Sequence, residues 1–152
     1  MIIRNANISD ASELLKLQKL AYLSEAVIYN NYRIPPLIQT LEDVEDKFED
    51  HIYLKVVDDG RIIGSIRGNV LDSRSVYIGR LIVHPDYQNQ GIGAKLIEKI
   101  EASYPGFNRF ELVTGYKSMK NIYFYQKIGY KIFKKELCPS GVYLLFLEKI
   151  VL

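Results

Sequence analysis

The stretch RLIVHPDYQNQGIGAKLIEKI, residues 80–100, decides the fold of this chain. An apolar run ends at His84-Pro85, and a segment with helical periodicity follows from Gly91 and Gly93. The pattern predicts a strand, a short turn and a helix that begins at the glycines. The first turn of a helix carries unpaired N–H groups and partial positive charge, and glycine leaves its backbone open to a phosphate. The segment therefore predicts a site for a phosphorylated ligand.

Two other phosphate-binding motifs do not fit this turn. A Walker loop requires Gly-Lys-Ser/Thr at the start of the helix, whereas Gly93 is followed by Ala94-Lys95-Leu96. A dinucleotide fingerprint requires a third glycine at position 96, which is leucine. Glycine at the start of a helix is also often purely structural, so spacing alone leaves that alternative open.

The composition predicts one ordinary globular domain over residues 1–152. Apolar residues make up 48% and charged residues 25%, which excludes disordered and fibrous classes. The 20 Lys and Arg against 18 Asp and Glu leave a net charge of +2, which argues against nucleic acid as the main partner. The one cysteine, Cys138, allows no internal disulfide or thiolate metal site, and we expect an inert thiol. With no long apolar run, a cytoplasmic protein without a membrane partner or a metal is expected.

Strand and helix patterns alternate on both sides of the 80–100 segment. Pro35-Pro36 predicts an irregular segment over residues 25–39. We expect strands at 1–6, 52–57, 62–70, 75–83, 109–114, 130–135 and 142–150, and helices at 9–22, 40–48, 91–104 and 118–128. This order predicts an α+β, or mixed α/β, fold with a mixed, mostly antiparallel sheet of about seven strands and helices on both faces.

Three motifs in this order resemble those of the GNAT N-acetyltransferases. The Q/R-x-x-G-x-G/A signature is matched by Gln88-Asn89-Gln90-Gly91-Ile92-Gly93. The family's V-x-P and Y-x-K-x-G-F/Y segments are matched by Val83-His84-Pro85 and by Tyr125-Gln126-Lys127-Ile128-Gly129-Tyr130. The resemblance covers nearly the whole chain, with residues 20–50 similar only in outline. It implies the GNAT acyl-CoA N-acyltransferase fold and acetyl-CoA, or coenzyme A, as the cofactor.

The resemblance also implies which residues hold the coenzyme. The backbone amides that bind its diphosphate would be those of Gln88, Asn89, Gln90, Gly91, Ile92, Gly93 and Ala94. The pantetheine arm would lie along the strand segment Leu81, Ile82 and Val83, like a neighbouring strand. A backbone N–H near Leu81 would polarise the thioester carbonyl.

The predicted helix 118–128 carries the candidate catalytic residue. Ser118 is a plausible N-cap, and Asn121 and Tyr125 share one face of the helix. The resemblance implies that Tyr125 lies beside the coenzyme sulfur and protonates the departing thiolate as general acid. Some relatives carry the pattern Thr-Gly-x-x-Ser-x-x-Asn-x-x-x-Tyr, which implies that Ser118 or Asn121 also contacts the coenzyme. The structural alternative for Tyr125 is a half-buried tyrosine with no chemical role.

The acceptor side is less well defined by the sequence. An alkylamine is mostly protonated at pH 7, so a base or a pocket that lowers its pKa is needed. Relatives often have a glutamate on the strand before the glycine turn, but residues 75–83 contain no carboxylate and have Arg80 instead. The candidates for the base are Glu25, His51, Glu111, or a water held by strand carbonyls or by Tyr77. Each carboxylate or histidine also has a structural explanation, with Glu25 as a surface charge at a helix end.

The segment 25–39 is expected to bind the acceptor. Tyr29, Tyr32 and Arg33 suit a polar or carboxylate-bearing small molecule, in a loop of the kind that lines acceptor pockets in the family. The alternative is that Val27, Ile28 and Tyr29 cap the core.

The sequence therefore predicts an acetyl-CoA-dependent N-acetyltransferase. The acceptor would be a primary amine of a small molecule or peptide, which attacks the thioester directly. The alternative function is a non-catalytic acyl-CoA-binding sensor or scaffold module. A homodimer is a further prediction, in which residues 142–150 pair with or pack on a second copy, because this strand is more apolar than one buried face requires.

Overall fold

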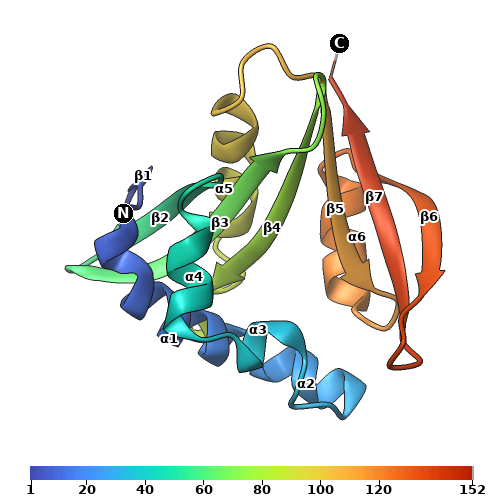
Figure 1. Cartoon of the computed structure of the whole chain (residues 1–152), viewed down its shortest axis with the longest axis horizontal. Coiled ribbons are helices and arrows are strands. Elements are labelled where there is room, and N and C mark those ends of the chain that lie inside the picture. Colours follow the sequence, from blue (N-terminus) through green and yellow to red (C-terminus); the bar gives the residue numbers. More distant parts are fainter. Residues whose placement is uncertain (152) are drawn as a thin grey trace.

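A computed structural model describes residues 1–151 and contains one seven-stranded sheet in the order β1-β2-β3-β4-β5-β7-β6 (Figure 1). The strands are β1 (Ile2–Asn5), β2 (Ile52–Asp58), β3 (Arg61–Val70), β4 (Ser75–Val83), β5 (Arg109–Gly115), β6 (Lys131–Leu137) and β7 (Tyr143–Ile150). The α-helices are α1 (Ala11–Ala21), α2 (Leu23–Tyr29), α3 (Pro35–Ile38), α4 (Leu41–Lys47), α5 (Ile92–Ala102) and α6 (Met119–Lys127). Only β4 and β5 pair in parallel. The predicted mixed, mostly antiparallel sheet is confirmed.

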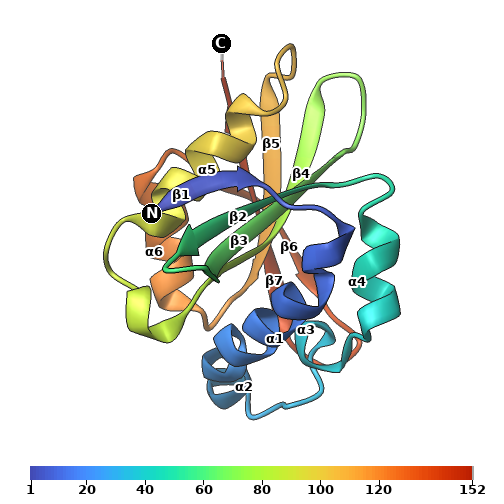
Figure 2. The same cartoon turned by 90° about the vertical axis from the view of Figure 1, so that its left-hand side faces the viewer.

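The prediction of an irregular segment over residues 25–39 is wrong, because α2 and α3 lie there. Pro35 and Pro36 form the first turn of α3, where a helix does not need their missing N–H groups. Asn30 ends α2 in the left-handed conformation, with φ of 47°. Figure 2 shows that α1, α2 and α3 gather at one end of the sheet, beside the site described below.

Helices cover both faces of the N-terminal half of the sheet, as predicted. Successive residues of a strand point to opposite faces, so Leu54 packs in the core under α5 while Tyr53 packs in the smaller core under α1. The core on the α5 side is the larger of the two. The buried residues that α5 contributes to it are Ile92, Leu96, Ile97 and Ile100. The α1 side contains Leu14, Leu17, Tyr53, Ile62 and Ile82.

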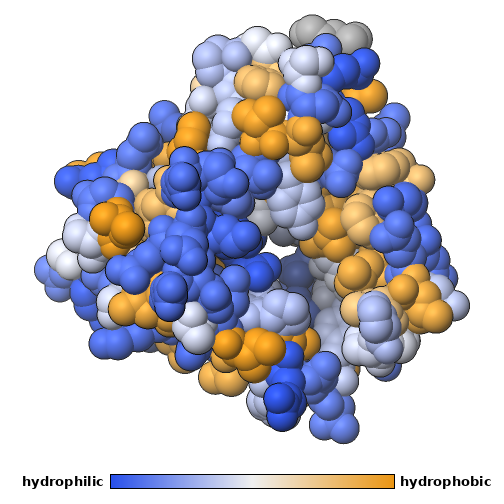
Figure 3. All heavy atoms as spheres, in the orientation of Figure 1, coloured by the Kyte–Doolittle hydropathy of each residue, from blue (hydrophilic) through white to orange (hydrophobic). Residues whose placement is uncertain are grey.

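Strands β4 and β5 separate after a short region of pairing. Their register covers only residues 75–77 of β4, so residues 78–83 have no partner on the β5 side. A β-bulge lies in the same part of β4. Between the pairs Arg67–Gly79 and Ser65–Ile82, β3 has one residue and β4 has two, of which Arg80 is left-handed with φ of 50°. Figure 3 shows a hollow between the two halves of the molecule, where the β4 and β5 ribbons run apart in Figure 1.

The C-terminal strands correct one part of the homodimer prediction. β7 lies between β5 and β6, so its backbone is paired on both sides and cannot pair with another chain. The edge strand at this end of the sheet is β6. It is exposed along its whole length, and its Phe133 packs against Phe146 of β7. Packing of a second copy on these strands stays a prediction, which sedimentation tests.

No helix within residues 1–151 is both long and apolar enough to cross a lipid bilayer. The same part of the chain brings together no group of three or more His, Cys, Asp or Glu side chains that is suited to a metal ion.

One ion pair fixes the start of α1 and gives the fold a pH-dependent contribution. Burial alone would raise the pKa of Asp10, but Lys55, 2.9 Å from its carboxylate, and the backbone N–H of Asn7 hold the pKa below its ordinary value. A carboxylate with a lowered folded-state pKa stabilises the protein above its unfolded-state pKa, and that contribution is lost as the pH falls through the folded value. Asp10→Asn should therefore lower the urea midpoint at pH 7, and the difference from the wild type should shrink below about pH 4.

The matched control is Asp46→Asn, because the Asp46 carboxylate is exposed and forms no ion pair among the described residues. A difference between Asp10→Asn and the wild type that is equal at pH 7 and pH 3 would contradict the assigned role of the ion pair.

Candidate active site

The turn between β4 and α5 presents unused backbone N–H groups. Asn89 and Gly91 are left-handed, with φ of 62° and 80°, and the first helical hydrogen bond runs from the N–H of Lys95 to the carbonyl of Gly91 (3.2 Å). Alternating backbone conformations of this kind make a concavity of N–H groups that suits an anion. The amide of Gln88 donates to the carbonyl of Val83 (3.2 Å) and ties the turn to the end of β4.

The turn has room for a diphosphate. A Cβ added at Gly91 would meet no atom within 4 Å, so open space lies next to the backbone there. Gly93 faces the protein instead, because a Cβ there would lie 3.3 Å from the ring of Phe124 in α6. The two glycines thus have different functions: one leaves the anion site open, and the other lets α5 approach α6.

The unpaired side of β4 leads from this turn into the hollow. Leu81 and Val83 pack partly against the main core, and Ile82 is buried in the smaller one. Because β5 has moved away, the backbone groups of residues 78–83 on that side are available to an extended ligand, as an added strand would use them. The turn and the unpaired strand together fit the diphosphate and the amide-containing arm of coenzyme A.

Tyr125 lies in α6, the helix that follows β5. Its ring packs against the main core beside Phe124 and Tyr130, and its hydroxyl forms no hydrogen bond within residues 1–151. Burial raises the pKa of Tyr125, and the neighbouring Tyr22, Tyr77 and Glu25 raise it further. The phenol therefore stays protonated at neutral pH and can donate one hydrogen bond to a ligand.

A hydrogen-bonded network joins α2 to the start of α6. The carboxylate of Glu25 accepts hydrogen bonds from Ser118 Oγ and from Asn121 Nδ2, both at 2.7 Å. Tyr29 is also part of the network, because its hydroxyl lies 2.7 Å from Ser118 Oγ and accepts a hydrogen bond from the N–H of Lys117 (3.0 Å). The side chain of Ser118 therefore binds α2 and makes no N-cap hydrogen bond. The interpretation of Glu25 as a surface charge at a helix end is wrong.

The remaining candidates for the base lie in other surroundings. His51 is hydrogen-bonded to Asp50 (2.6 Å), and burial lowers its pKa. Glu111 is bound to Arg109 (2.8 Å) in an ion pair. Tyr77 is half-buried near Tyr125, and burial raises its pKa, so it holds its proton at neutral pH.

The three residues predicted to bind the acceptor, Tyr29, Tyr32 and Arg33, do not lie together in the structure. Tyr29 belongs to the network around Glu25, in α2 rather than in a loop. Tyr32 and Arg33 are exposed, and Tyr32 helps to line a separate shallow pocket with Lys19, Leu20, Leu23 and Leu37. The sequence interpretation missed Tyr22, which lies between α1 and α2, and Arg67, which lies on β3 beside Tyr53. A signal for Arg67 exists, since it is a charged residue within the otherwise apolar run of a buried strand.

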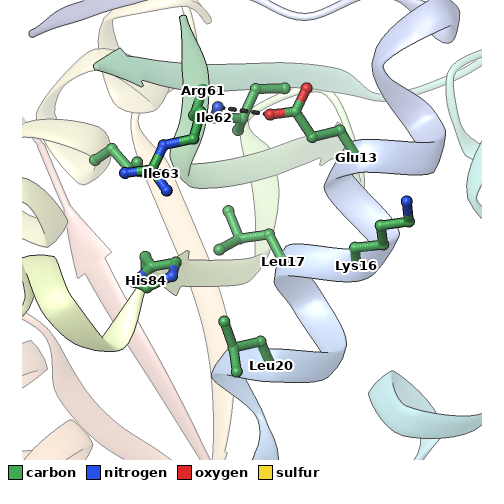
Figure 4. Close-up of a pocket in the computed structure, with 8 residues that line it drawn as sticks. All are labelled: Glu13, Lys16, Leu17, Leu20, Arg61, Ile62, Ile63 and His84. Atoms are coloured by element: carbon green, nitrogen blue, oxygen red, sulfur yellow. Dashed lines mark hydrogen bonds between the residues drawn. The ribbon is translucent and has the colours of Figure 1, made fainter. Parts of the chain in front are cut away.

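A second pocket lies between α1 and the ends of β3 and β4 (Figure 4). Its lining residues are Glu13, Lys16, Leu17, Leu20, Arg61, Ile62, Ile63 and His84. The Glu13 carboxylate accepts the backbone N–H of Ile62 at 2.7 Å, as drawn in Figure 4, so it fixes α1 on the sheet. This pocket does not include Tyr125 or Glu25.

Comparison with known proteins identifies the class. The model of the acetyltransferase (GNAT) family matches residues 13–130. The chain is 28% identical over 143 residues to an uncharacterized N-acetyltransferase, CT2212, of Chlorobaculum tepidum, covering 93% of this chain and 82% of that protein. Among solved structures, the PaiA N-acetyltransferase of Thermoplasma acidophilum in complex with coenzyme A superposes with a TM-score of 0.78 at 20% identity, covering 98% of both chains. The ribosomal-protein-S18-alanine N-acetyltransferase of Escherichia coli gives 0.79 at 15%, covering 99% and 93%.

The chain therefore belongs to the GNAT family of acetyltransferases. It is an acetyl-CoA-dependent N-acetyltransferase, and the fold, the family resemblance and the cofactor expected from the sequence are confirmed.

Gly115 determines how closely α2 approaches α6. A Cβ added there would lie 2.0 Å from the hydroxyl oxygen of Tyr29, so the two cannot coexist without a shift. Gly115→Ala should displace Tyr29, loosen the network around Glu25 and lower the free energy of unfolding by about 1–3 kcal/mol. Chemical denaturation measures this effect.

The matched control is the pair Tyr29→Ala and Gly115→Ala together. The second substitution should destabilise much less in the absence of the Tyr29 ring than in the wild type, because contacting residues couple. Additive effects would show that the close approach is not what limits position 115.

Proposed function

We propose that this enzyme transfers the acetyl group to a primary amine of a small molecule or peptide by direct attack on the thioester, with Tyr125 as the general acid. The observation that supports this role is the hydroxyl of Tyr125, which forms no hydrogen bond within residues 1–151, while the ring packs against the main core and Tyr77 of β4 is near enough to raise its pKa. Acetyl-CoA, when bound, supplies a thioester whose C–S bond breaks as the new C–N bond forms. No covalent bond to the enzyme is needed.

The cofactor would be held by the groups that fit it. The N–H groups of residues 88–94 would bind the diphosphate, and the free side of β4 at Leu81, Ile82 and Val83 would bind the pantetheine arm. A backbone N–H near Leu81 would donate to the thioester carbonyl. Ser118 and Asn121 would act on the coenzyme side only through the orientation of α6, because their side chains bind Glu25.

The raised pKa of Tyr125 limits how it can help the leaving group. A free thiol is already more acidic than a free phenol, and burial widens that gap. The same burial also destabilises a departing thiolate, which then binds a proton more tightly. The negative charge that develops on the coenzyme sulfur, away from water, therefore drives proton transfer from Tyr125. The transfer requires a hydrogen bond between the Tyr125 hydroxyl and that sulfur.

Glu25 is the base that we propose among the candidates. An alkylamine at pH 7 must lose a proton at a cost of about 4.6 kcal/mol relative to its neutral form. The two groups that donate hydrogen bonds to Glu25 are a neutral hydroxyl and a neutral amide. Within residues 1–151, no Lys, Arg or His nitrogen lies within 4 Å of its carboxylate to balance the charge. Each carboxylate oxygen keeps a free acceptor position, which suits a substrate ammonium group.

The proposed class of acceptor is tested by release of free thiol from acetyl-CoA in the presence of a panel of amines. Thiol release that depends on a primary amine supports the proposed acceptor, and release that no primary amine increases would contradict it.

Tyr125→Phe should reduce kcat by about 10²-fold or more, since a positioned acid contributes in that range. The affinity for coenzyme A, measured by calorimetry, should stay within a few-fold of the wild type. The matched control is Tyr123→Phe, because Tyr123 lies on the same helix and is 68% exposed. Wild-type turnover in Tyr125→Phe would remove the general-acid role.

Glu25→Gln should lower kcat/KM for the amine by about 10²-fold near pH 7 and less at high pH, where the amine is already neutral. The pH profile of kcat/KM is the measurement. A loss that is equal at every pH would indicate that Glu25 serves only to hold α2 on α6.

A further inference from the structure

Two arginines of the sheet have no acidic partner, and one of them, Arg80, belongs to the part of β4 that is unpaired on the β5 side. Arg67 on β3 and Arg80 in the bulge of β4 both lie on the face that α1 covers, beside Tyr53 and Tyr77. No Asp or Glu oxygen within residues 1–151 lies within 4 Å of either guanidinium group. Burial of a charge is costly unless it is paired, so two neighbouring cations in this position require an explanation.

Arg67 is buried, with 9% of its surface exposed. It donates one hydrogen bond, from Nη1 to the Tyr53 hydroxyl (3.1 Å), and its guanidinium lies 6.0 Å from the centre of the same ring. A guanidinium group has five N–H donors. Because no buried side-chain nitrogen in the described chain is without a partner, the remaining donors open onto accessible space.

Arg80 adds a second guanidinium to the same space. Its Nε makes one long contact, 3.4 Å, with the amide oxygen of Gln39, and that oxygen also accepts from Gln18 at 2.7 Å. Burial lowers the pKa of Arg80, and the like charge of Arg67 lowers it further, although the nearby Tyr22 opposes this. The two cations therefore act on each other, and an anion placed between them would relieve both.

The carboxylates closest to this space are already used by other groups. Glu111 lies on the neighbouring strand and is bound to Arg109. Glu25 acts on Tyr22 but holds Ser118 and Asn121. The positive charge of the arginine pair is consequently left for a ligand.

From this arrangement, and resting on the proposed function, we infer that the acceptor is an amine that also carries a carboxylate, and that Arg67 and Arg80 bind the carboxylate. Arg80 directly precedes Leu81, whose N–H is proposed to bind the thioester carbonyl, so a carboxylate held there keeps the rest of a small acceptor near the reacting carbon. Tyr22 is close enough to Arg67, Arg80 and Glu25 for the charges of all three to act on the pKa of its hydroxyl, so the cations and the carboxylate belong to one neighbourhood. A zwitterionic molecule would thus find a cationic end and an anionic end of one site. A polar or carboxylate-bearing acceptor was also predicted at Tyr29, Tyr32 and Arg33, whereas this proposal assigns the carboxylate to Arg67 and Arg80.

The test compares three acids with their amides: L-leucine, L-lysine and β-alanine against L-leucinamide, L-lysinamide and β-alaninamide. Each is titrated by calorimetry into the wild-type protein with coenzyme A, and each is assayed with acetyl-CoA by thiol release, with kcat/KM expressed per neutral amine. At least one acid should bind, and should react, about tenfold or more better than its amide, because a carboxylate accepts charge-assisted hydrogen bonds from guanidinium groups.

The variants Arg67→Gln and Arg80→Gln should raise KM for that acid at least tenfold and change the values for its amide by less than a factor of three. Arg80→Gln is less expected to disturb folding than Arg67→Gln, because Arg80 is only half-buried. The comparison of acid with amide in the wild-type protein needs no variant. The matched control is Arg4→Gln, an exposed arginine on β1, which should leave the ratio unchanged.

The outcomes separate this inference from the proposed function. If acids bind in preference to amides but no amine releases thiol, the carboxylate site stands and the proposed transfer is wrong. If amides react as well as acids, the transfer stands and the carboxylate site is wrong. Failure of every acid to bind, or equal losses for acid and amide in Arg80→Gln, would show that the arginine pair serves the fold through Tyr53 and Gln39.

Discussion

The separation of β4 from β5 is the constraint on which the rest of the site depends. A parallel pair that continued past Tyr77 would close the sheet and leave no backbone for a ligand. The extra residue in β4, with Arg80 in the left-handed conformation, bends the strand next to the point of separation and keeps its other side paired with β3. The main core beneath α5 and α6 holds the two halves together, because it contains residues of both, such as Ile78 of β4 and Leu112 of β5.

The hollow also needs a wall on its acceptor side, and α2 provides it. Glu25 and Tyr29 bind residues at the start of α6, so a helix from the N-terminal half closes on a helix from the C-terminal half. The network places an anion near Tyr125, while Arg67 and Arg80 place cations on the sheet. The site therefore combines the carboxylate of Glu25 with the guanidinium groups of Arg67 and Arg80, and an acceptor that carries both an amine and a carboxylate would match both charges.

The sequence predicted the parts of the fold and site that depend on local patterns. The glycine turn, the order of strands along the chain and the helix that carries Tyr125 follow from periodicity and spacing over short stretches. The partners of Glu25 could not be predicted, because Ser118 lies 93 residues away and meets it only through tertiary packing. Arg67 has a local signal, as a charged residue in an apolar strand, but its lack of an acidic partner is visible only once the sheet is folded. The error at Pro35 was local, because proline breaks a helix in its interior but not in its first turn.

The decisive measurement is a crystal structure of the protein bound to coenzyme A. We expect the diphosphate on the N–H groups of the turn around Gly91 and the pantetheine arm along the free side of β4. We expect the sulfur within hydrogen-bonding distance of the Tyr125 hydroxyl. Coenzyme A bound away from the space between β4 and β5, or a sulfur remote from Tyr125, would contradict this proposal.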